Sequence, residues 1–292
     1  MPTLRLRAGL RNVISADNYI TMNDIPKIDP HAPLLIFDSG IGGLSVLRAI
    51  KEQLPLAPIV YAADYAGLPY GTKSEAEIAA RVPALLGRLV ERYKPALVVI
   101  ACNTACTIAL SHVRAALNVP VVGTVPAIKP ASLATHSGVI GLLGTQATIR
   151  QPYVDQLQAE FASELTLLRY AAPDLVHAAE AKMRGGSADK HVISDAVAGL
   201  TCQPGGDRMD TIILGCTHFP LLLQELAQAT GAKMQFTDGA QGIARRVAKV
   251  SEGRGWPNTP HEGIFVTTSS CTEMEPYRSA IAVYGLTKIE SL

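Results

Sequence analysis

Two segments of the chain share a pattern that is centred on a cysteine. Residues 98–105 read VVIACNTA and residues 212–219 read IILGCTHF, so Cys102 and Cys216 occupy matching positions. In each segment an apolar run is followed by one small residue, the cysteine and a polar pair that could cap a helix. The pattern predicts two junctions between a strand and a helix, and each junction carries a thiol.

A thiol at such a junction lies where open α/β sheets bind their ligands. The unpaired N–H groups and the positive end of the helix dipole favour the thiolate, so we expect a lowered pKa for both cysteines. If Cys102 and Cys216 face each other across a cleft, one can remove a Cα proton while the other returns a proton to the opposite face. That arrangement inverts a stereocentre, which is the chemistry of a cofactor-independent amino acid racemase.

Three other interpretations of the cysteines stay open at this point. Both could be small buried hydrophobic residues, the commonest fate of a free cysteine. His218 follows Cys216 by two positions, so a Cys-His amidohydrolase is the second alternative, although it leaves Cys102 without a role. The third is a binding protein that keeps the fold without the chemistry.

Polar residues at the same kind of junction could hold the substrate. Proton removal from an amino acid places negative charge on Cα and the carboxylate, which N–H groups and hydroxyls at helix starts stabilise. Asn103, Thr104 and Thr217 occupy such positions, although as plain helix caps they need no further role. Asp38 and Ser39, in IFDSGIGG, could bind a substrate ammonium or polarise a neighbouring thiol; otherwise they cap a helix.

Five further residues are weaker candidates for the site. Tyr70 and Gly71 lie in LPYGTKS, whose composition is that of a turn. Thr145 and Thr148 follow another apolar run and could cap a helix or contact a ligand. Glu180 looks like a charge on a helix face or loop, and its spacing gives no argument for a catalytic role.

The sequence indicates no cofactor. The glycines after Asp38 form G-x-G-G, which departs from the G-x-G-x-x-G of dinucleotide sites. No lysine stands in the Gly- and Ser-rich phosphate context of pyridoxal phosphate enzymes, and Lys129 looks like a loop or helix-face charge. Cys102 and Cys106 are four residues apart, but no nearby Cys or His pair completes a tetrahedral zinc site.

Short apolar runs alternate with stretches of helical spacing along the chain. Because the runs are continuous rather than alternating, they predict strands buried on both faces, hence an α/β protein with parallel sheets covered by helices. Ser74 and Glu77 form a capping box ahead of a helix, and Pro83 should kink or split that helix. The runs lie at residues 34–37, 58–61, 97–100, 139–143, 164–168, 211–214 and 264–267.

At 292 residues and 48% hydrophobic, the chain is long enough for two domains with separate cores. The proline-rich segment 120–130 is the predicted crossing between them, and a second crossing near residues 236–239 returns the chain. The predicted division is an N-terminal leader at 1–33, a first domain at 34–126 with 238–292, and a second domain at 127–237.

Composition argues against several classes of partner. A formal net charge of +1 provides no field that would attract nucleic acid, whereas a local site could still bind a charged small molecule. The five cysteines are an odd, scattered set without a disulfide framework, which indicates a reducing cytoplasm. No apolar run approaches the roughly 20 residues of a membrane helix, and no signal peptide is evident.

Seven segments, in chain order, resemble the signature segments of the glutamate racemases, within the aspartate/glutamate racemase family. They run from about Leu34 to Arg246 and read DSGIGGLSV, LPYGTKS, ACNTA, VVGTVPAIKPA, GLLGTQATIR, GCTHFPLL and TDGAQGIARR. The resemblance implies two Rossmann-like parallel-sheet domains related by pseudo-twofold symmetry, with the active site in the cleft between them. It also implies interconversion of L- and D-glutamate for peptidoglycan synthesis, without pyridoxal phosphate, metal or nucleotide.

The resemblance assigns roles residue by residue. Cys102 and Cys216 match the family's two acid/base groups, and Asp38 and His218 match the groups that assist their respective thiols. Glu180 lies where many members have an acidic residue bordering the cleft. The implied substrate contacts are Asp38, Ser39, Tyr70, Gly71, Asn103, Thr104, Thr217 and His218.

Substrate and partners follow less directly from the resemblance. Related aspartate racemases usually have Glu in place of His218, so the GCTH segment favours glutamate, with aspartate or another amino acid as the alternative. Some members with an N-terminal leader are similar in being activated by a muramoyl nucleotide, a peptidoglycan precursor. The resemblance leaves open such an activator here, and the choice between monomer and homodimer.

Overall fold

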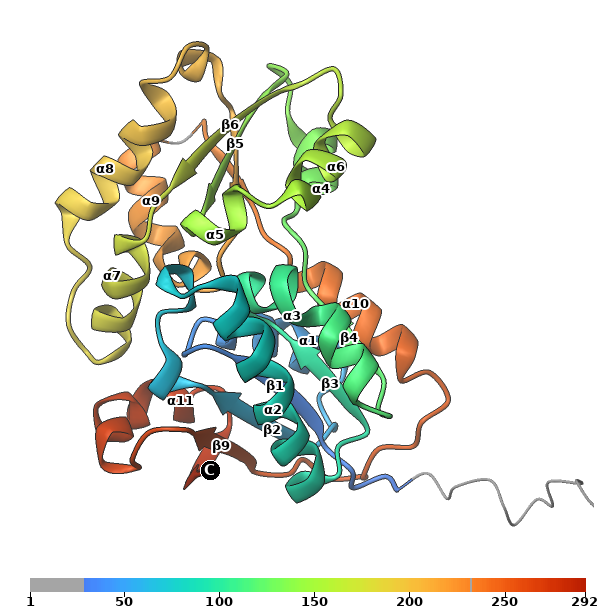
Figure 1. Cartoon of the computed structure of the whole chain (residues 1–292). Coiled ribbons are helices and arrows are strands. Elements are labelled where there is room, and N and C mark those ends of the chain that lie inside the picture. The colour runs from blue at the N-terminus through green and yellow to red at the C-terminus, as the bar shows by residue number, and fades with distance from the viewer. Residues whose placement is uncertain (1–28, 232) are drawn as a thin grey trace, which may run out of the picture.

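The computed structural model describes residues 29–231 and 233–292, so residues 1–28 of the predicted leader lie outside the described residues. Two β-sheets, each with parallel strands only, form a lower and an upper lobe (Figure 1). The lower sheet has the order β10-β9-β2-β1-β3-β4, and the upper sheet has the order β6-β5-β7-β8. The predicted α/β class with two parallel sheets is therefore confirmed.

Helices cover both faces of the lower sheet. In β1, Leu34 and Ile36 pack in the apolar core beneath α1 and α10, while Leu35 and Phe37 pack in the core beneath α2 and α3. Burial on both faces explains why β1 has a continuous apolar sequence. The lower-lobe elements are β1 (Leu34–Asp38), α1 (Leu44–Gln53), β2 (Ile59–Ala63), α2 (Glu75–Tyr93), β3 (Leu97–Ile100), α3 (Asn103–Ala116), β4 (Val121–Gly123), α10 (Ala240–Val250), β9 (Gly263–Thr267), α11 (Arg278–Ala282) and β10 (Leu286–Ser291).

The upper sheet is sandwiched in the same way. In β5, Val139 and Leu143 belong to the core with α7, α8 and α9, whereas Ile140 and Leu142 belong to the core with α4 and α6. The upper-lobe elements are α4 (Ile128–Ala134), β5 (Val139–Gly144), α5 (Gln146–Ile149), α6 (Pro152–Phe161), β6 (Thr166–Ala171), α7 (Asp174–Met183), α8 (Lys190–Thr201), β7 (Thr211–Leu214), α9 (Leu223–Thr230) and β8 (Gln235–Thr237).

The two sheets share an order of strands. Within the lower sheet β2-β1-β3-β4 are neighbours, and the upper sheet runs β6-β5-β7-β8, so in each the first strand lies between the second and the third. Cys102 follows the third strand of one series and Cys216 follows the third strand of the other. The thiols therefore occupy topologically equivalent positions. The pseudo-twofold relation and the domain limits stay predictions.

Helix α2 confirms one expectation from the sequence and contradicts another. Ser74 caps α2, because its side chain accepts a hydrogen bond from the Glu77 N–H at 3.2 Å. The expectation that Pro83 could split the helix is wrong, since α2 runs unbroken through it. A buried stripe that includes Ile78, Val82 and Leu86 packs α2 onto the lower sheet and offsets the lost backbone hydrogen bond. Within the described residues no helix is long and apolar enough to cross a membrane.

Candidate active site

Cys102 and Cys216 line one small cavity between the lobes, although they come from different sheets. Cys102 is the N-cap of α3, whereas Cys216 precedes a short 3-10 helix (Phe219–Leu222), so only the first junction has the predicted α-helix start. The cavity volume of about 40 Å³ holds a few water molecules. The lobes are therefore shut too tightly for an amino acid to enter without their separation.

Most of the predicted contacts meet at this cavity. Register explains the convergence: Phe37 pairs with Ile100 and Leu143 pairs with Leu214, so the segments after these strands emerge at matching sheet edges. Asp38, Thr148 and Glu180 are buried behind the lining residues rather than among them. The predicted residues that line the cavity are Ser39, Tyr70, Gly71, Cys102, Asn103, Thr104, Thr145, Cys216, Thr217 and His218.

The surroundings of Cys102 favour its protonated thiol. Its sulfur donates to Ser39 Oγ at 3.6 Å and accepts from the Ala105 N–H at 3.5 Å. Burial, together with the negative charge of Asp38, raises the pKa of Cys102 far above its ordinary value. The expectation of a lowered pKa is therefore wrong for Cys102, because loss of water outweighs one N–H donor at the helix start.

Asp38 joins the lobes beneath the thiols. Its Oδ1 accepts from the Gly40 N–H at 2.9 Å, and its Oδ2 accepts from the Thr217 hydroxyl of the upper lobe at 3.0 Å. Burial raises the pKa of Asp38, although the nearby His218 acts in the opposite direction. Asp38 thus acts on Cys102 through its charge and through the backbone turn that carries Ser39.

A buried ion pair lies beside Cys216. His218 Nδ1 is 3.9 Å from the Cys216 sulfur, and His218 Nε2 is 2.8 Å from Glu180 Oε1. Burial acts to lower the pKa of His218, but its bonds with Cys216 and Glu180 outweigh burial and raise it well above the ordinary value. Burial acts to raise the pKa of Glu180, but the bond with His218 leaves it lowered. These shifts favour an imidazolium paired with a carboxylate, and such a cation would stabilise negative charge on the sulfur.

From its spacing Glu180 is predicted to be a charge on a helix face or loop, but the structure buries its side chain between the lobes. Its side chain is 2% exposed, because α7 turns this residue inward against the lower lobe. The spacing of residues could not reveal this burial, because the groups that bond to the Glu180 carboxylate come from segments far away in the sequence. They are His218, Tyr65, Tyr277 and the Ile41 N–H.

Three threonine hydroxyls bridge the lobes on another side of the cavity. Thr104 Oγ1 lies 3.0 Å from Thr145 Oγ1 and 3.4 Å from Thr148 Oγ1, and the latter two are 3.0 Å apart. Thr145 also caps α5 by accepting from the Thr148 N–H. The hydroxyls can turn toward a substrate carboxylate because each is both donor and acceptor.

Asp64 was missed by the sequence argument. It is fully buried after β2, and its carboxylate accepts from the Tyr70 hydroxyl at 2.5 Å and from two nitrogens of Arg81. These bonds fix the turn that presents Gly71 to the cavity. A Cβ at Gly71 would lie 2.9 Å from Thr145 Cβ, so a larger residue there would force the lobes apart. In the sequence Asp64 lies in no recognisable motif, so nothing near it indicates a role at the site.

A family model described as Asp/Glu/Hydantoin racemase matches residues 42–247 of the chain. The chain belongs to this family. The match spans the segment from the turn after β1 to α10 and therefore contains both cysteines, His218 and Glu180.

Individual family members are similar over nearly the whole chain. The glutamate racemase of Sphingopyxis alaskensis is 60% identical over 263 residues, which cover 90% of this chain and 98% of that protein. The Escherichia coli glutamate racemase, crystallised with L-glutamate and the activator UDP-MurNAc-ala, has a TM-score of 0.81 and 38% identity, with 89% and 98% coverage. Glutamate racemase RacE1 from Bacillus anthracis has a TM-score of 0.79 and 28% identity, with 90% and 98% coverage.

Replacing Glu180 by Gln tests the ion pair. Without the carboxylate, the pKa of His218 should fall toward its ordinary value of about 6.5, and turnover should fall about 10- to 100-fold. Imidazole ¹⁵N resonances followed against pH measure the first effect. Glu225→Gln, which removes an ion pair with Lys182, is the control. It should change neither the pKa of His218 nor the turnover. A wild-type His218 that titrates near 6.5 would contradict the assignment.

Proposed function

We propose that the chain is a glutamate racemase that interconverts L- and D-glutamate by direct proton transfer between Cα and two thiols. The observation that carries the proposal is that Cys102 and Cys216, from separate lobes, line one small cavity. Membership of the racemase family and the 60% identity to a glutamate racemase support glutamate as the substrate. The product D-glutamate then serves peptidoglycan synthesis.

The two thiols start a turnover in different states. With one enantiomer, the Cys216 thiolate beside the His218 cation takes the Cα proton, and the Cys102 thiol gives its proton to the opposite face. The sulfur–hydrogen bond of Cys102 breaks as the new carbon–hydrogen bond forms, so the enzyme ends with the charge on Cys102. That state accepts the other enantiomer, and proton exchange with solvent restores the first state.

The carbanion needs stabilisation that the cavity can supply. Charge that develops on the substrate carboxylate would meet the N–H groups at the start of α3 and the hydroxyls of Thr104, Thr145 and Thr217. Ser39 contacts Cys102 and lines the cavity, so its hydroxyl is available to a substrate ammonium, with the Asp38 carboxylate buried behind it. When the lobes close over a substrate and exclude bulk water, these dipoles act more strongly than they would in an open cleft.

Single replacement of either catalytic cysteine should abolish racemisation. In Cys102→Ala or Cys216→Ala one face of Cα loses its acid/base group, so the loss of optical activity from L-glutamate should slow by at least about 10³-fold. Polarimetry without added cofactor measures the rate. Cys202→Ala is the matched control and should keep the wild-type rate, because Cys202 is exposed and does not line the cavity. Near-full turnover in either catalytic variant would refute the assigned roles.

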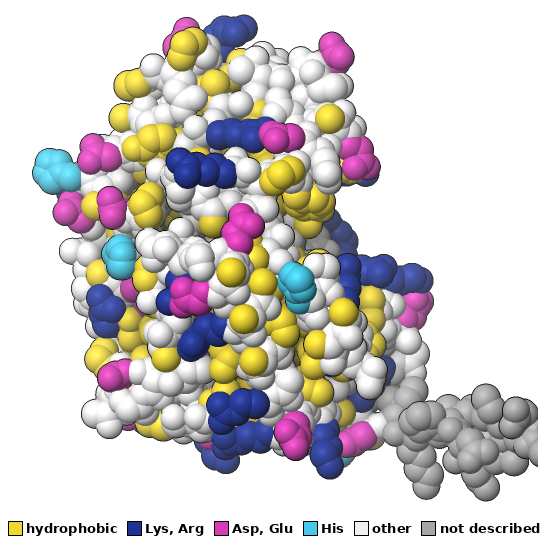
Figure 2. Space-filling view, viewed as in Figure 1, with side chains coloured by type: hydrophobic (Ala, Val, Ile, Leu, Met, Phe, Trp, Pro, Cys, Tyr) yellow, Lys and Arg dark blue, Asp and Glu magenta, His cyan; other side chains and the backbone are white. Residues whose placement is uncertain are grey.

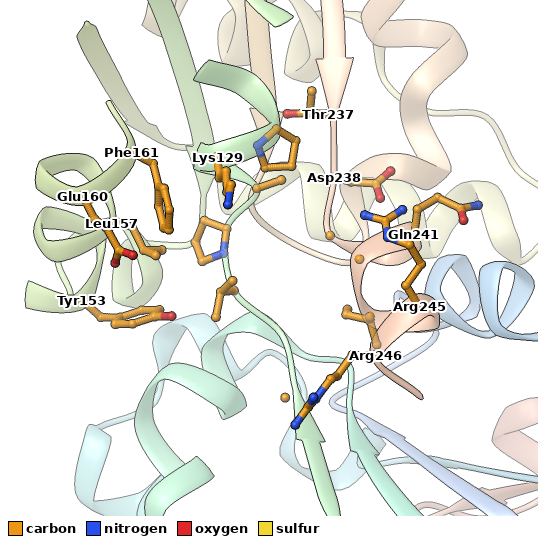
Figure 3. Close-up of a pocket in the computed structure, with 18 of the residues that line it drawn as sticks. Lys129, Tyr153, Leu157, Glu160, Phe161, Thr237, Asp238, Gln241, Arg245 and Arg246 are labelled. Atoms are coloured by element: carbon orange, nitrogen blue, oxygen red, sulfur yellow. The ribbon is translucent and has the colours of Figure 1, made fainter. Parts of the chain in front are cut away.

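An activator of the class that the E. coli structure contains has a suitable place in this chain. A second cavity of about 800 Å³ lies where the chain crosses between the lobes, and its size is typical of ligand sites. Figure 2 shows the molecule hollowed between the lobes at one edge. In Figure 3, Lys129, Tyr153 and Phe161 of the upper lobe face Arg245 and Arg246 of α10.

We propose that this crossing cavity binds a uridine-diphosphate muramoyl peptide. Its three cations outnumber the carboxylates of Glu160 and Asp238, so it offers a net positive charge to a diphosphate, while two aromatic rings could stack on a base. The hydroxyl oxygen of Thr237 is buried there without a partner among the described residues. An occupant would contact both lobes, so its binding energy can shift their opening equilibrium.

Titration with UDP-MurNAc-Ala tests this placement. We expect the wild-type turnover of L-glutamate to rise with the ligand, and Arg246→Ala to weaken binding about tenfold through loss of a charge-assisted bond. Calorimetry gives the affinity independently of activity. Arg88→Ala, an exposed arginine on α2, is the control and should bind as wild type. If the wild-type protein does not bind the nucleotide, the proposed activator site is wrong.

A further inference from the structure

We propose that Tyr277 and Tyr65 are positioning residues for Cys216, which they hold in place through Glu180 and His218 only while the lobes are in contact. The inference rests on the proposed racemase function, because it concerns the same thiol. Neither tyrosine lines the cavity, and neither stands in a motif that the sequence singled out. Both act on the carboxylate that supports the catalytic imidazolium.

The tyrosines belong to the lower lobe and the carboxylate to the upper lobe. Tyr277 lies in a 3-10 helix (Thr272–Tyr277) between β9 and β10, and Tyr65 begins another (Tyr65–Gly67) shortly after β2. Glu180 projects from α7, which descends beside the C-terminal segment in Figure 1. The contact therefore joins segments that are 115 and 97 residues apart in the chain.

The two oxygens of Glu180 have separate partners. Oε2 accepts from the Tyr277 hydroxyl at 2.6 Å and from the Tyr65 hydroxyl at 3.0 Å, while Oε1 faces His218 Nε2 at 2.8 Å. The carboxylate cannot rotate without losing hydroxyl donors, so its plane is fixed. That plane sets the imidazole orientation, and the imidazole meets the Cys216 sulfur on its other side.

Tyr277 is itself held in place from the upper lobe. Arg184 donates from one terminal nitrogen to the Tyr277 hydroxyl at 2.8 Å, and its guanidinium carbon lies 5.6 Å from the ring centroid. The ring also packs against Tyr65, with centroids 5.4 Å apart. The hydroxyl proton of Tyr277 is therefore directed at Glu180, because its oxygen already accepts from Arg184.

Separation of the lobes would change the electrostatics of the pair. Glu180, His218, Cys216 and Arg184 would stay together in the upper lobe, whereas Tyr65, Tyr277 and the charge of Asp38 would move away with the lower lobe. Water would then replace the tyrosine donors, and both ions of the pair would become solvated. The geometry thus makes the supported imidazolium a property of the closed state, in which the substrate is enclosed.

The Tyr277→Phe variant tests the inference, because it keeps the ring and removes only the hydroxyl. Without the Tyr277 hydroxyl the Glu180 carboxylate can turn away from His218 Nε2, so the pair should weaken. We expect kcat to fall about tenfold with little change in KM, and the titration of His218 to move to lower pH. Tyr284→Phe is the matched control, because Tyr284 lies near Tyr277 in the chain and also bonds to an arginine. Its hydroxyl accepts a hydrogen bond from Arg48 at 2.7 Å, and the Arg48 guanidinium lies over its ring. Tyr284 makes no hydrogen bond to Glu180. The control should leave both quantities unchanged.

The readouts separate positioning from stability and from the proposed function. Equal shifts in Tyr277→Phe and Tyr284→Phe, or a wild-type His218 titration in Tyr277→Phe, would overturn the inference. A fall in melting temperature common to both variants, with the His218 shift confined to Tyr277→Phe, supports it. If the wild-type protein fails to racemise glutamate, the proposed function fails, while the ¹⁵N titration of His218 still decides whether Tyr277 positions it.

Discussion

Contact between the two lobes is the constraint on which the rest of the structure depends. A single carbon can be reached from both sides only if thiols on different sheets share one cavity, and that requires the lobes to be shut. Polar bonds hold them: Thr217 to Asp38, Thr104 to Thr145, and Tyr277 to Glu180. Water can replace such bonds when the lobes part, so closure costs little to reverse and substrate can enter.

The surroundings of the two thiols differ although their places in the fold are equivalent. Cys102 has a carboxylate nearby and a hydroxyl that accepts a hydrogen bond from its thiol, whereas Cys216 has the His218 imidazole beside it. A racemase with two identical sites would have no preferred resting state, and both sulfurs could carry the same charge. The charge of Asp38 disfavours a thiolate at Cys102, whereas the imidazole beside Cys216 can stabilise negative charge on that sulfur during the proposed proton transfer.

The sequence predicted features that arise from local pattern and missed those that arise from assembly. The repeated cysteine segments marked both thiols, and continuous apolar runs marked strands such as β1. The edge strands β4, β8 and β10 were missed: β4 and β8 have only three residues each, and β10 mixes buried, half-buried and exposed residues instead of forming a continuous apolar run. Glu180, to which only the family resemblance pointed, gains its role from partners that are distant in the chain. Asp64 gains its role from Tyr70 and Arg81, which only the folded turn brings to its carboxylate. Burial decided the charge state of Cys102, and only packing reveals burial.

The distribution of deuterium between substrate and product tests the two-thiol account most directly. L-Glutamate is converted in deuterated water to a few per cent, and the Cα label is measured separately in each enantiomer. Two thiols that act on opposite faces predict that nearly all new D-glutamate carries deuterium, while the remaining L-glutamate retains protium. Protium in the product, or deuterium in unreacted L-glutamate at a rate similar to racemisation, would show that a single base serves both faces and would contradict the account.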